Sequence, residues 1–336
     1  MLSHVVYVVA LWVVFANSAV GKPRWCCKSH LEYIKCRYLA ANVNFNFDCV
    51  RAADTDHCMI KIQNNEADLI DLDGGDVFKY RDQITVVAAE DSGSGNARYY
   101  AIAVVKANSD PSISLGNLAG RATCHTGVGK TSGWNMPIGW LMRHSYNPSN
   151  FRASCAPGAY DPTYQSLLPD KNYAKWCRLC VGDGRGNHVC ERDSDETYYS
   201  YHGSLNCMKV GGGDVAFMKE TTILPAEQDD FMLLCPNLTR AHPSQWSSCN
   251  LGRVPSHAVV MKAGTPTGVI SHMITSLNNL MRDVTPILAR RYGKNLLWSS
   301  STQQFLPAPA DPVEYVGHDY FCNMFSLTYR SVHPTC

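Results

Sequence analysis

The number of cysteines is the feature that most restricts how this chain can fold. The 336-residue sequence contains 15 of them, and an apolar run at residues 5–15 precedes the first. That run, with the small residues after it, is typical of a cleaved signal peptide and marks residues 1–21 as a leader. In an oxidising compartment the cysteines pair as disulfides, and an odd number leaves one thiol over. We therefore expect a secreted, extracellular, disulfide-rich protein.

Composition excludes several classes of function. Hydrophobic residues make up 45% of the chain and charged residues 18%, which describes a folded globular protein larger than one ordinary core. The formal net charge of +1 offers no attraction to nucleic acid or to an anionic membrane. After the leader, no segment reaches the ~18 apolar residues that a membrane span needs. We expect a monomer with no nucleic-acid partner and no membrane span.

Residues 124–135 combine hydroxyls, glycines and one cation, Lys130, directly before a helical pattern. Backbone N–H groups and the positive end of the helix dipole would converge there, which suits a small anion. Gly129-Lys130-Thr131 also resembles the end of a nucleotide-binding P-loop, but that pattern requires glycine where this chain has Cys124. A plain glycine-rich turn is the third interpretation.

Four further side chains stand next to predicted strands or helices. Asp73 follows a short apolar strand, Tyr99 begins a run apolar enough for the centre of a parallel sheet, Tyr201 ends a polar segment, and His257 leads another strand. Each has a structural explanation: a turn or N-cap aspartate, packing tyrosines and a strand-edge histidine. Strand alternation places Tyr99 and Tyr100 on opposite faces, so only one of them can face a given site.

Together, these four groups suit Fe³⁺. Hard oxygen ligands with one nitrogen favour a small, highly charged cation. A phenol with a pKa of about 10 ionises at neutral pH only beside a strong Lewis acid. One carboxylate, two phenolates and a neutral imidazole balance the ferric charge and leave two octahedral positions open. A bidentate carbonate would fill both, and Lys130 with the adjacent helix start would offset its charge.

Several long motifs occur in one order along the chain. They are Arg24-Trp25-Cys26, Asp73 before a glycine turn, and the segments 99–106, 124–129, 132–139, 214–219 and 254–257. On these motifs the chain resembles the transferrin family almost from Arg24 to Cys336. Members usually have two lobes, so this sequence resembles a single-lobe (monolobal) transferrin.

The resemblance implies an α/β fold like that of type II periplasmic binding proteins, with two α/β domains around a hinged cleft and two crossing strands. Domain one would comprise residues 22–97 and 256–336, and domain two residues 98–255. By position, the implied iron ligands are Asp73, Tyr99, Tyr201 and His257. The implied anion pocket is formed by Thr126, Lys130 and the backbone N–H groups of Ser132 and Gly133.

The resemblance also implies a disulfide pattern. The implied pairs are Cys26–Cys58, Cys36–Cys49, Cys124–Cys207, Cys155–Cys180, Cys177–Cys190 and Cys235–Cys249, which leaves Cys27, Cys322 and Cys336 without an assigned partner. Two alternatives are a zinc site among the N-terminal cysteines and a redox or zinc pair in Cys177-Arg-Leu-Cys180. Asn237 is the one sequon not blocked by proline, and we expect it to be glycosylated.

Two departures from the family pattern bear on function. Lys130 replaces the usual arginine, and of an acid-sensitive lysine pair only Lys219 remains, because its partner position is Ser299. We expect a non-enzymatic carrier that binds one Fe³⁺ with carbonate or bicarbonate and releases it by hinge opening and acidification, with a cell-surface receptor as a further partner. The alternative is a transferrin-like protein that binds another ligand or withholds iron as defence.

Overall fold

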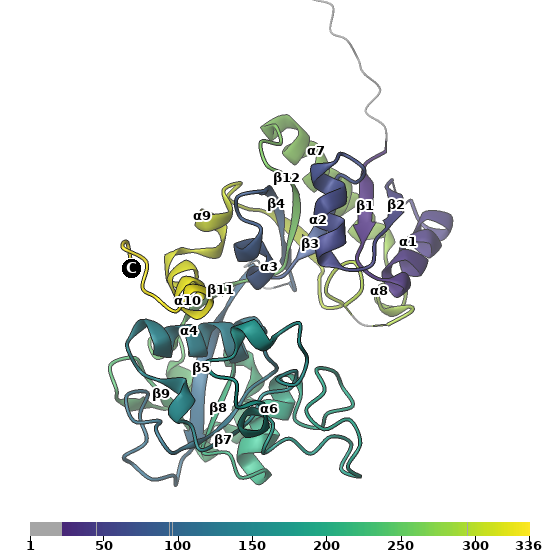
Figure 1. Cartoon of the computed structure of the whole chain (residues 1–336). Coiled ribbons are helices and arrows are strands. Elements are labelled where there is room, and N and C mark those ends of the chain that lie inside the picture. The colour runs from purple at the N-terminus through teal and green to yellow at the C-terminus, as the bar shows by residue number, and fades with distance from the viewer. Residues whose placement is uncertain (1–21, 45, 94, 96, 294) are drawn as a thin grey trace, which may run out of the picture.

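Two mixed β-sheets organise the chain, one in each of two units that are drawn one above the other in Figure 1. The computed structural model describes residues 22–44, 46–93, 95, 97–293 and 295–336. The signal-peptide prediction for residues 1–21 falls outside that part of the chain. No helix in the described ranges is both long and apolar enough to cross a bilayer.

The first sheet has six strands in the order β13-β4-β12-β3-β1-β2. Strand β1 is parallel to β2 and β3, whereas β12 lies antiparallel between β3 and β4. The strands are β1 (Arg24–Cys27), β2 (Asp48–Arg51), β3 (Leu69–Leu72), β4 (Ile84–Asp91), β12 (Ala258–Lys262) and β13 (Gln304–Pro307). The helices around this sheet are α1 (His30–Asn42), α2 (Thr55–Gln63), α3 (Gly74–Lys79), α7 (Thr267–Asp283), α8 (Pro286–Arg290) and α9 (Pro312–Val316).

The second sheet is built around β5 and has the order β10-β9-β5-β8-β6-β7, with β11 also pairing with β5. The strands are β5 (Arg98–Lys106), β6 (Ala122–Cys124), β7 (Ala153–Cys155), β8 (Val215–Lys219), β9 (Phe231–Leu234), β10 (Arg240–Ala241) and β11 (Gly252–Pro255). The longer helices beside it are α4 (Met136–Arg143), preceded by a π-turn, Thr131–Asn135, and α6 (Ser200–Val210), with the short α5 (Tyr173–Trp176). Short 3₁₀ turns lie at Pro148–Asn150, Gln165–Leu167, Glu220–Thr222, Pro225–Asp230 and Pro243–Gln245.

Strand β5 is central, as its apolar sequence predicts, but the expectation of parallel neighbours is wrong. Its pairings with β8, β9 and β11 are all antiparallel. Residues 101–105 are buried on both faces of the sheet. Their continuous apolar run therefore indicates that both faces are covered, and it does not indicate whether neighbouring strands are parallel or antiparallel.

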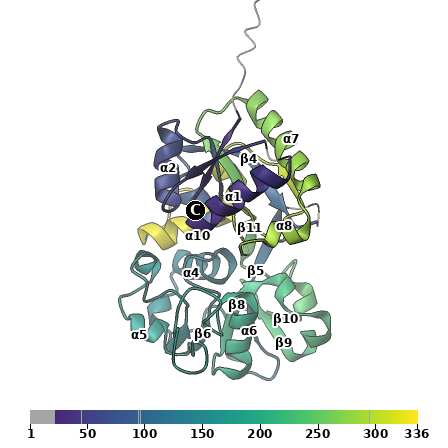
Figure 2. The ribbon, with the colours of Figure 1, turned by 90° about the vertical axis from the view of Figure 1, so that its right-hand side faces the viewer.

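The chain passes between the two sheets twice. One passage runs from β4 into β5 and the other from β11 into β12, and both views place β5 and β11 at the junction of the two units. The two strands pair there, with Val254 opposite Tyr99 (Figures 1 and 2). The first unit therefore contains two separate parts of the sequence.

The C-terminal helix α10 (His318–Tyr329) packs on the second unit, although the expected division groups residues 256–336 with the first. A Cβ atom added at Gly139 of α4 would lie 2.2 Å from the carbonyl oxygen of Asn323, so the two helices approach closely. Arg143 Nη1 also pairs with Asp319 Oδ1 at 3.2 Å. In Figure 1 this helix (yellow) lies between the two units.

Seven disulfides connect the described cysteines. Six are the pairs that the resemblance implies, and the seventh joins Cys322 to Cys336. Cys27 is buried and is the free cysteine of the described chain. Because Cys177 and Cys180 bond to different partners, the redox interpretation of that pair is wrong. Four of the five N-terminal cysteines are also in disulfides, which leaves Cys27 as a single thiol and too few ligands for a zinc site.

Candidate metal and anion site

Asp73 and His257 come together at one edge of the first sheet. Strand β3 ends at Leu72, which pairs with Ala258 of the antiparallel β12, so the next residue on each strand is Asp73 and His257. Asp73 caps α3 through Oδ1, which accepts hydrogen bonds from the backbone N–H groups of Gly75 at 2.8 Å and Asp76 at 3.0 Å. The expected N-cap and the candidate ligand are therefore the same carboxylate.

Tyr99 and Tyr201 contact each other through their phenols. Tyr99 lies in β5, and Tyr201 in the first turn of α6. Burial raises the pKa of Tyr99 well above its ordinary value, and the neighbouring phenol of Tyr201, to which Tyr99 donates a hydrogen bond, adds to the rise. Burial also raises the pKa of Tyr201, while hydrogen bonds from Ser132 and Tyr99 oppose that rise. Tyr100, on the other face, packs against Trp246 with ring centroids 5.1 Å apart.

Tyr320 and Asn135 connect the carboxylate edge to the tyrosine pair. The Tyr320 phenol of α10 lies near Asp73, and burial followed by the Asp73 charge raises the pKa of Tyr320. Asn135 Nδ2 donates to Tyr320 at 3.4 Å and to the carbonyl of Gly129 at 3.0 Å. A Cβ atom on Gly75 would lie 3.0 Å from the same Nδ2 atom. The start of α3 thus lies directly against the loop that leads into α4.

The predicted anion pocket contains two buried hydroxyls, of which Thr126 lacks a partner. Thr126 is fully buried and its hydroxyl oxygen has no hydrogen bond within the described chain, whereas Ser132, 1% exposed, bonds to the phenol of Tyr201. A Cβ atom at Gly133 would lie only 2.1 Å from Thr126 Oγ1, so glycine is required there. Unsatisfied buried hydroxyls are rare because each one costs free energy. A small oxyanion would satisfy the Thr126 hydroxyl.

The helix start beside these hydroxyls leaves backbone donors available. The N–H groups of Trp134 and Asn135 donate to the carbonyl of Lys130 at 3.0 and 2.9 Å, so the N–H groups of Ser132 and Gly133 precede the first bonds of the helix. The N–H of Ser200 donates to the carbonyl of Thr126 at 2.9 Å, which ties the first turn of α6 to the same loop. The donor set fits carbonate as well as any small planar oxyanion.

Two lysines lie beside tyrosine rings at this site. Lys130 Nζ is 4.6 Å from the ring centroid of Tyr199, and Lys219 Nζ is 4.9 Å from that of Tyr201. Ser299 instead donates its backbone N–H to Glu90 Oε1 at 3.0 Å. The Lys219 ammonium therefore contacts the aromatic ring of Tyr201, a candidate iron ligand.

Comparison with known proteins decides the family. Residues 23–329 match the family model for Transferrin. The chain belongs to the transferrin family. It is 33% identical to melanotransferrin of Homo sapiens over 95% of this chain, 34% identical to serotransferrin of Paralichthys olivaceus over 95%, and 36% identical to serotransferrin-1 of Salmo salar over 94%. The matches cover 47%, 46% and 46% of those proteins, so the chain spans about half the length of the curated relatives it matches.

The resemblance seen in the sequence is thus confirmed, and so is the α/β, disulfide-rich transferrin-lobe fold. The four candidate ligands come from an edge of the first sheet and from β5 and α6 of the second unit. Tyr99 and Tyr201 contact each other, Asp73 and His257 follow paired residues of β3 and β12, and Tyr320 with the loop before α4 lies beside Asp73.

Sequence reasoning missed two buried acids next to His257 of this transferrin chain. Asp71 is 2% exposed and Glu90 5%, and one potential ligand atom from each of Asp71, Glu90 and His257 lies within 4.8 Å of the others. Burial raises the pKa of each carboxyl to about 8. The available signal was an aspartate inside the apolar run Leu69–Leu72, where a charged residue needs a reason.

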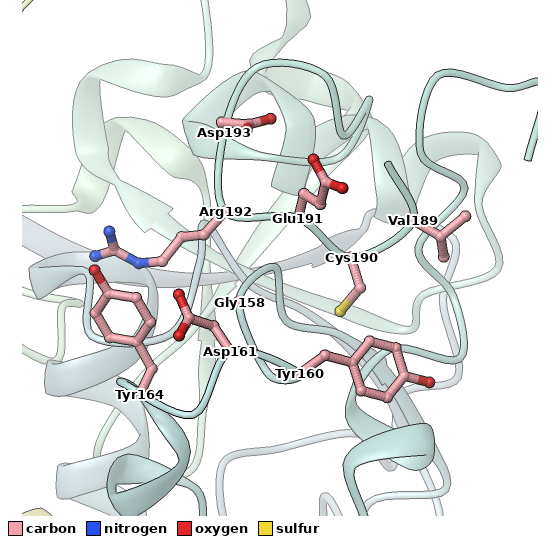
Figure 3. A pocket seen from close by; sticks show the side chains of 9 residues that line it. All are labelled: Gly158, Tyr160, Asp161, Tyr164, Val189, Cys190, Glu191, Arg192 and Asp193. Atoms are coloured by element: carbon pink, nitrogen blue, oxygen red, sulfur yellow. The ribbon is translucent and has the colours of Figure 1, made fainter. Parts of the chain in front are cut away.

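A separate hollow of about 480 Å³ lies between Tyr164, Arg192 and Tyr160 (Figure 3). It contains none of the candidate ligands. Arg192 closes one side of it, stacking its guanidinium 4.1 Å from the ring centroid of Tyr164 and donating from Nε to the carbonyl of Val128 at 2.7 Å. The remaining lining residues are Gly158, Asp161, Val189, Cys190, Glu191 and Asp193. The Arg192 contact supports the predicted anion loop at Val128.

Proposed function

We propose that this transferrin chain binds one ferric ion reversibly, together with carbonate or bicarbonate, and carries it outside the cell. Asp73, Tyr99, Tyr201 and His257 would supply the metal ligands. Thr126, Lys130 and the N–H groups of Ser132 and Gly133 would hold the anion. The chain acts by binding rather than catalysis.

The observation that carries the proposal is the contact between the phenols of two partly buried tyrosines, Tyr99 and Tyr201. Burial raises the pKa of both, so neither phenol ionises at neutral pH unaided. A trivalent cation supplies the charge that displaces these protons, whereas a divalent ion of the same size supplies less. This argument favours Fe³⁺ over zinc or calcium.

Reversibility follows from how the ligands are distributed. Asp73 and His257 lie on the first unit, and Tyr99 and Tyr201 on β5 and α6, while β5 and β11 form the junction. A hinge at these two strands would separate the ligand pairs without breaking either sheet. Protonation of His257 and of the anion at acid pH would drive release.

Secretion forms part of the same proposal. Seven disulfides require an oxidising compartment, and Asn237 is exposed in the turn between β9 and β10, as a glycan acceptor must be. The leader interpretation of residues 1–21 and the glycosylation of Asn237 remain predictions.

An absorbance titration of the metal-free protein with Fe³⁺ and bicarbonate tests the proposal. Phenolate ligation predicts a visible charge-transfer band and a salmon-pink colour. Tyr201→Phe should abolish the band, and Tyr100→Phe, on the opposite face of β5, should leave it intact. A protein that stays colourless would instead favour a family member that binds another ligand, and an unchanged band in Tyr201→Phe would remove Tyr201 from the ligand set.

A further inference from the structure

Asp71 holds the imidazole of His257 from inside the sheet. Its Oδ2 atom lies 3.0 Å from His257 Nδ1. The Asp71 side chain is 3% exposed, whereas the His257 side chain is 42% exposed. The ring is therefore anchored at its buried nitrogen, and Nε2 lies on the opposite side of the ring.

Glu90 is the other carboxyl near the ring, but its oxygens have partners elsewhere. Thr302 Oγ1 donates to Glu90 Oε2 at 2.6 Å, and the N–H of Ser299 donates to Oε1 at 3.0 Å. Asp71 also shares a side-chain hydrogen bond with Glu90, so Asp71 is the acid whose side chain bonds to the imidazole of His257, and Glu90 supports Asp71. The two acids thus have different roles.

Backbone contacts fix both ends of the Asp71–His257 pair. Lys28 Nζ donates to the carbonyl of Asp71 at 2.9 Å. The N–H of Glu90 donates to the carbonyl of His257 at 2.9 Å, and the Tyr315 hydroxyl donates to the carbonyl of Ser256 at 2.9 Å. Neither partner can move away without breaking these bonds, so the 3.0 Å contact is held on both sides.

We propose that Asp71 is the positioning residue of the metal site, because it fixes the His257 ring with its proton on Nδ1 and directs Nε2 towards the metal. Outer-sphere carboxylates that accept from the distal nitrogen of a ligating histidine fix its tautomer and raise its basicity. The inference rests on the proposed function in that His257 serves as a ligand. The hydrogen bond itself exists without metal.

The direct test is ¹⁵N NMR of the His257 ring in metal-free protein at about pH 9, where an ordinary imidazole is neutral. The Nδ1–H form should dominate in the unmodified protein. In Asp71→Ala the ratio of Nδ1–H to Nε2–H should fall at least about tenfold, the effect of losing a charge-assisted hydrogen bond. Asp71→Asn keeps the shape of the buried side chain and an acceptor oxygen, so it should fold normally and retain more of the Nδ1–H form than alanine does.

Two control variants separate orientation from a general change of charge. Glu90→Gln neutralises the second buried acid near the ring, and Asp76→Asn neutralises a neighbour of Asp73 that has no bond to His257; both should preserve the tautomer ratio. An unchanged ratio in both Asp71 variants, or a shift in Glu90→Gln alone, would overturn the inference.

Loaded protein provides a second readout. Transfer of Fe³⁺ to a chelator at neutral pH should be about 10- to 100-fold faster in Asp71→Ala, with rescue by asparagine. If the unmodified protein never develops colour, the proposed function fails while the tautomer result stands. If it loads normally and the Asp71 variants keep both its tautomer ratio and its release rate, the inference alone fails.

Discussion

The phenol of Tyr99 on β5 donates a hydrogen bond to the phenol of Tyr201 on α6. Burial raises the pKa of both groups, so the pair is neutral in metal-free protein at physiological pH. Any ligand that uses both oxygens as anions must displace both protons. The metal must therefore be strong enough a Lewis acid to keep both phenols ionised, and it is lost at a pH where protons compete successfully for their oxygens.

Lys130→Arg should strengthen the dependence of iron binding on carbonate. Arginine grips an oxyanion with two parallel donors, whereas lysine offers a single point charge. The bicarbonate concentration needed for half-maximal colour should fall several-fold. Lys171→Arg, at an exposed position, is the matched control, and an unaltered bicarbonate requirement in Lys130→Arg would refute this role for residue 130.

Gly133→Ala should disrupt the anion pocket specifically. The added Cβ atom would lie 2.1 Å from Thr126 Oγ1, so the helix start or the Thr126 side chain must move. Iron binding should weaken at least about tenfold, because the hydroxyl and the N–H donors no longer converge. Gly268→Ala in α7, where a Cβ atom meets nothing within 4 Å, should bind iron normally and gain about 0.5–1 kcal/mol of stability. Chelator competition measures the first effect and thermal unfolding the second; equal binding by both variants would contradict the assignment.

Lys219→Ala should shift the pH midpoint of iron release by less than about one unit. The ammonium lies 4.9 Å from the ring centroid of Tyr201, and cation–π contacts of this kind contribute about 0.5–1 kcal/mol. Its former partner position, Ser299, carries no charge. Lys209→Ala, on the same helix as Tyr201, is the control. A shift of two units or more would mean that Lys219 is itself the acid trigger.

His125 should make the second unit sensitive to acid. It is fully buried, its ring nitrogens bond to the carbonyl of Gly133 and the hydroxyl of Thr123 at 3.0 Å each, and burial lowers its pKa from 6.5 to about 4. The folded state therefore favours the neutral ring, and its stabilisation is full above pH 6.5. The unfolded chain takes up a proton first as the pH falls, so stability drops by roughly 3 kcal/mol between pH 6.5 and 4.

Denaturant unfolding of metal-free protein at several pH values checks this prediction. His125→Gln should show a shallower loss of stability over that range, and His202→Gln, at an exposed position on α6, should follow the unmodified protein. Parallel curves for all three proteins would assign the acid sensitivity to other groups.

The fold was predicted from long motifs that occur in a fixed order along the chain. Segments 99–106 and 132–139 identify the family by their exact residues and not only by their hydrophobic pattern. Patterns alone failed at β5, where burial on both faces gives the same apolar run in antiparallel and parallel sheets. The contact of α10 with α4 could not be predicted from the sequence either, because the apolar face of an amphipathic helix does not show which of the two units it packs against.

The site was predicted residue by residue only where the family resemblance supplied a position. Asp71 and Tyr320 were missed because a lone acid in a strand and a tyrosine in a helix are usually explained by packing. Spacing could not place His257 at the same sheet edge as Asp73, since that placement depends on the antiparallel pairing of β12 with β3. The Cys322–Cys336 disulfide could likewise be assigned only once the structure showed where the C-terminal residues lie.

The central claim is that Asp73, Tyr99, Tyr201 and His257 hold one ferric ion with an anion bound beside the α4 helix start. A spectrophotometric titration with Fe³⁺, performed with and without bicarbonate, tests it most directly. The account predicts one equivalent of iron, a visible phenolate-to-iron band that requires bicarbonate, and loss of that band in Tyr99→Phe and Tyr201→Phe. A full band without any added anion, or no band at all in the unmodified protein, would contradict it.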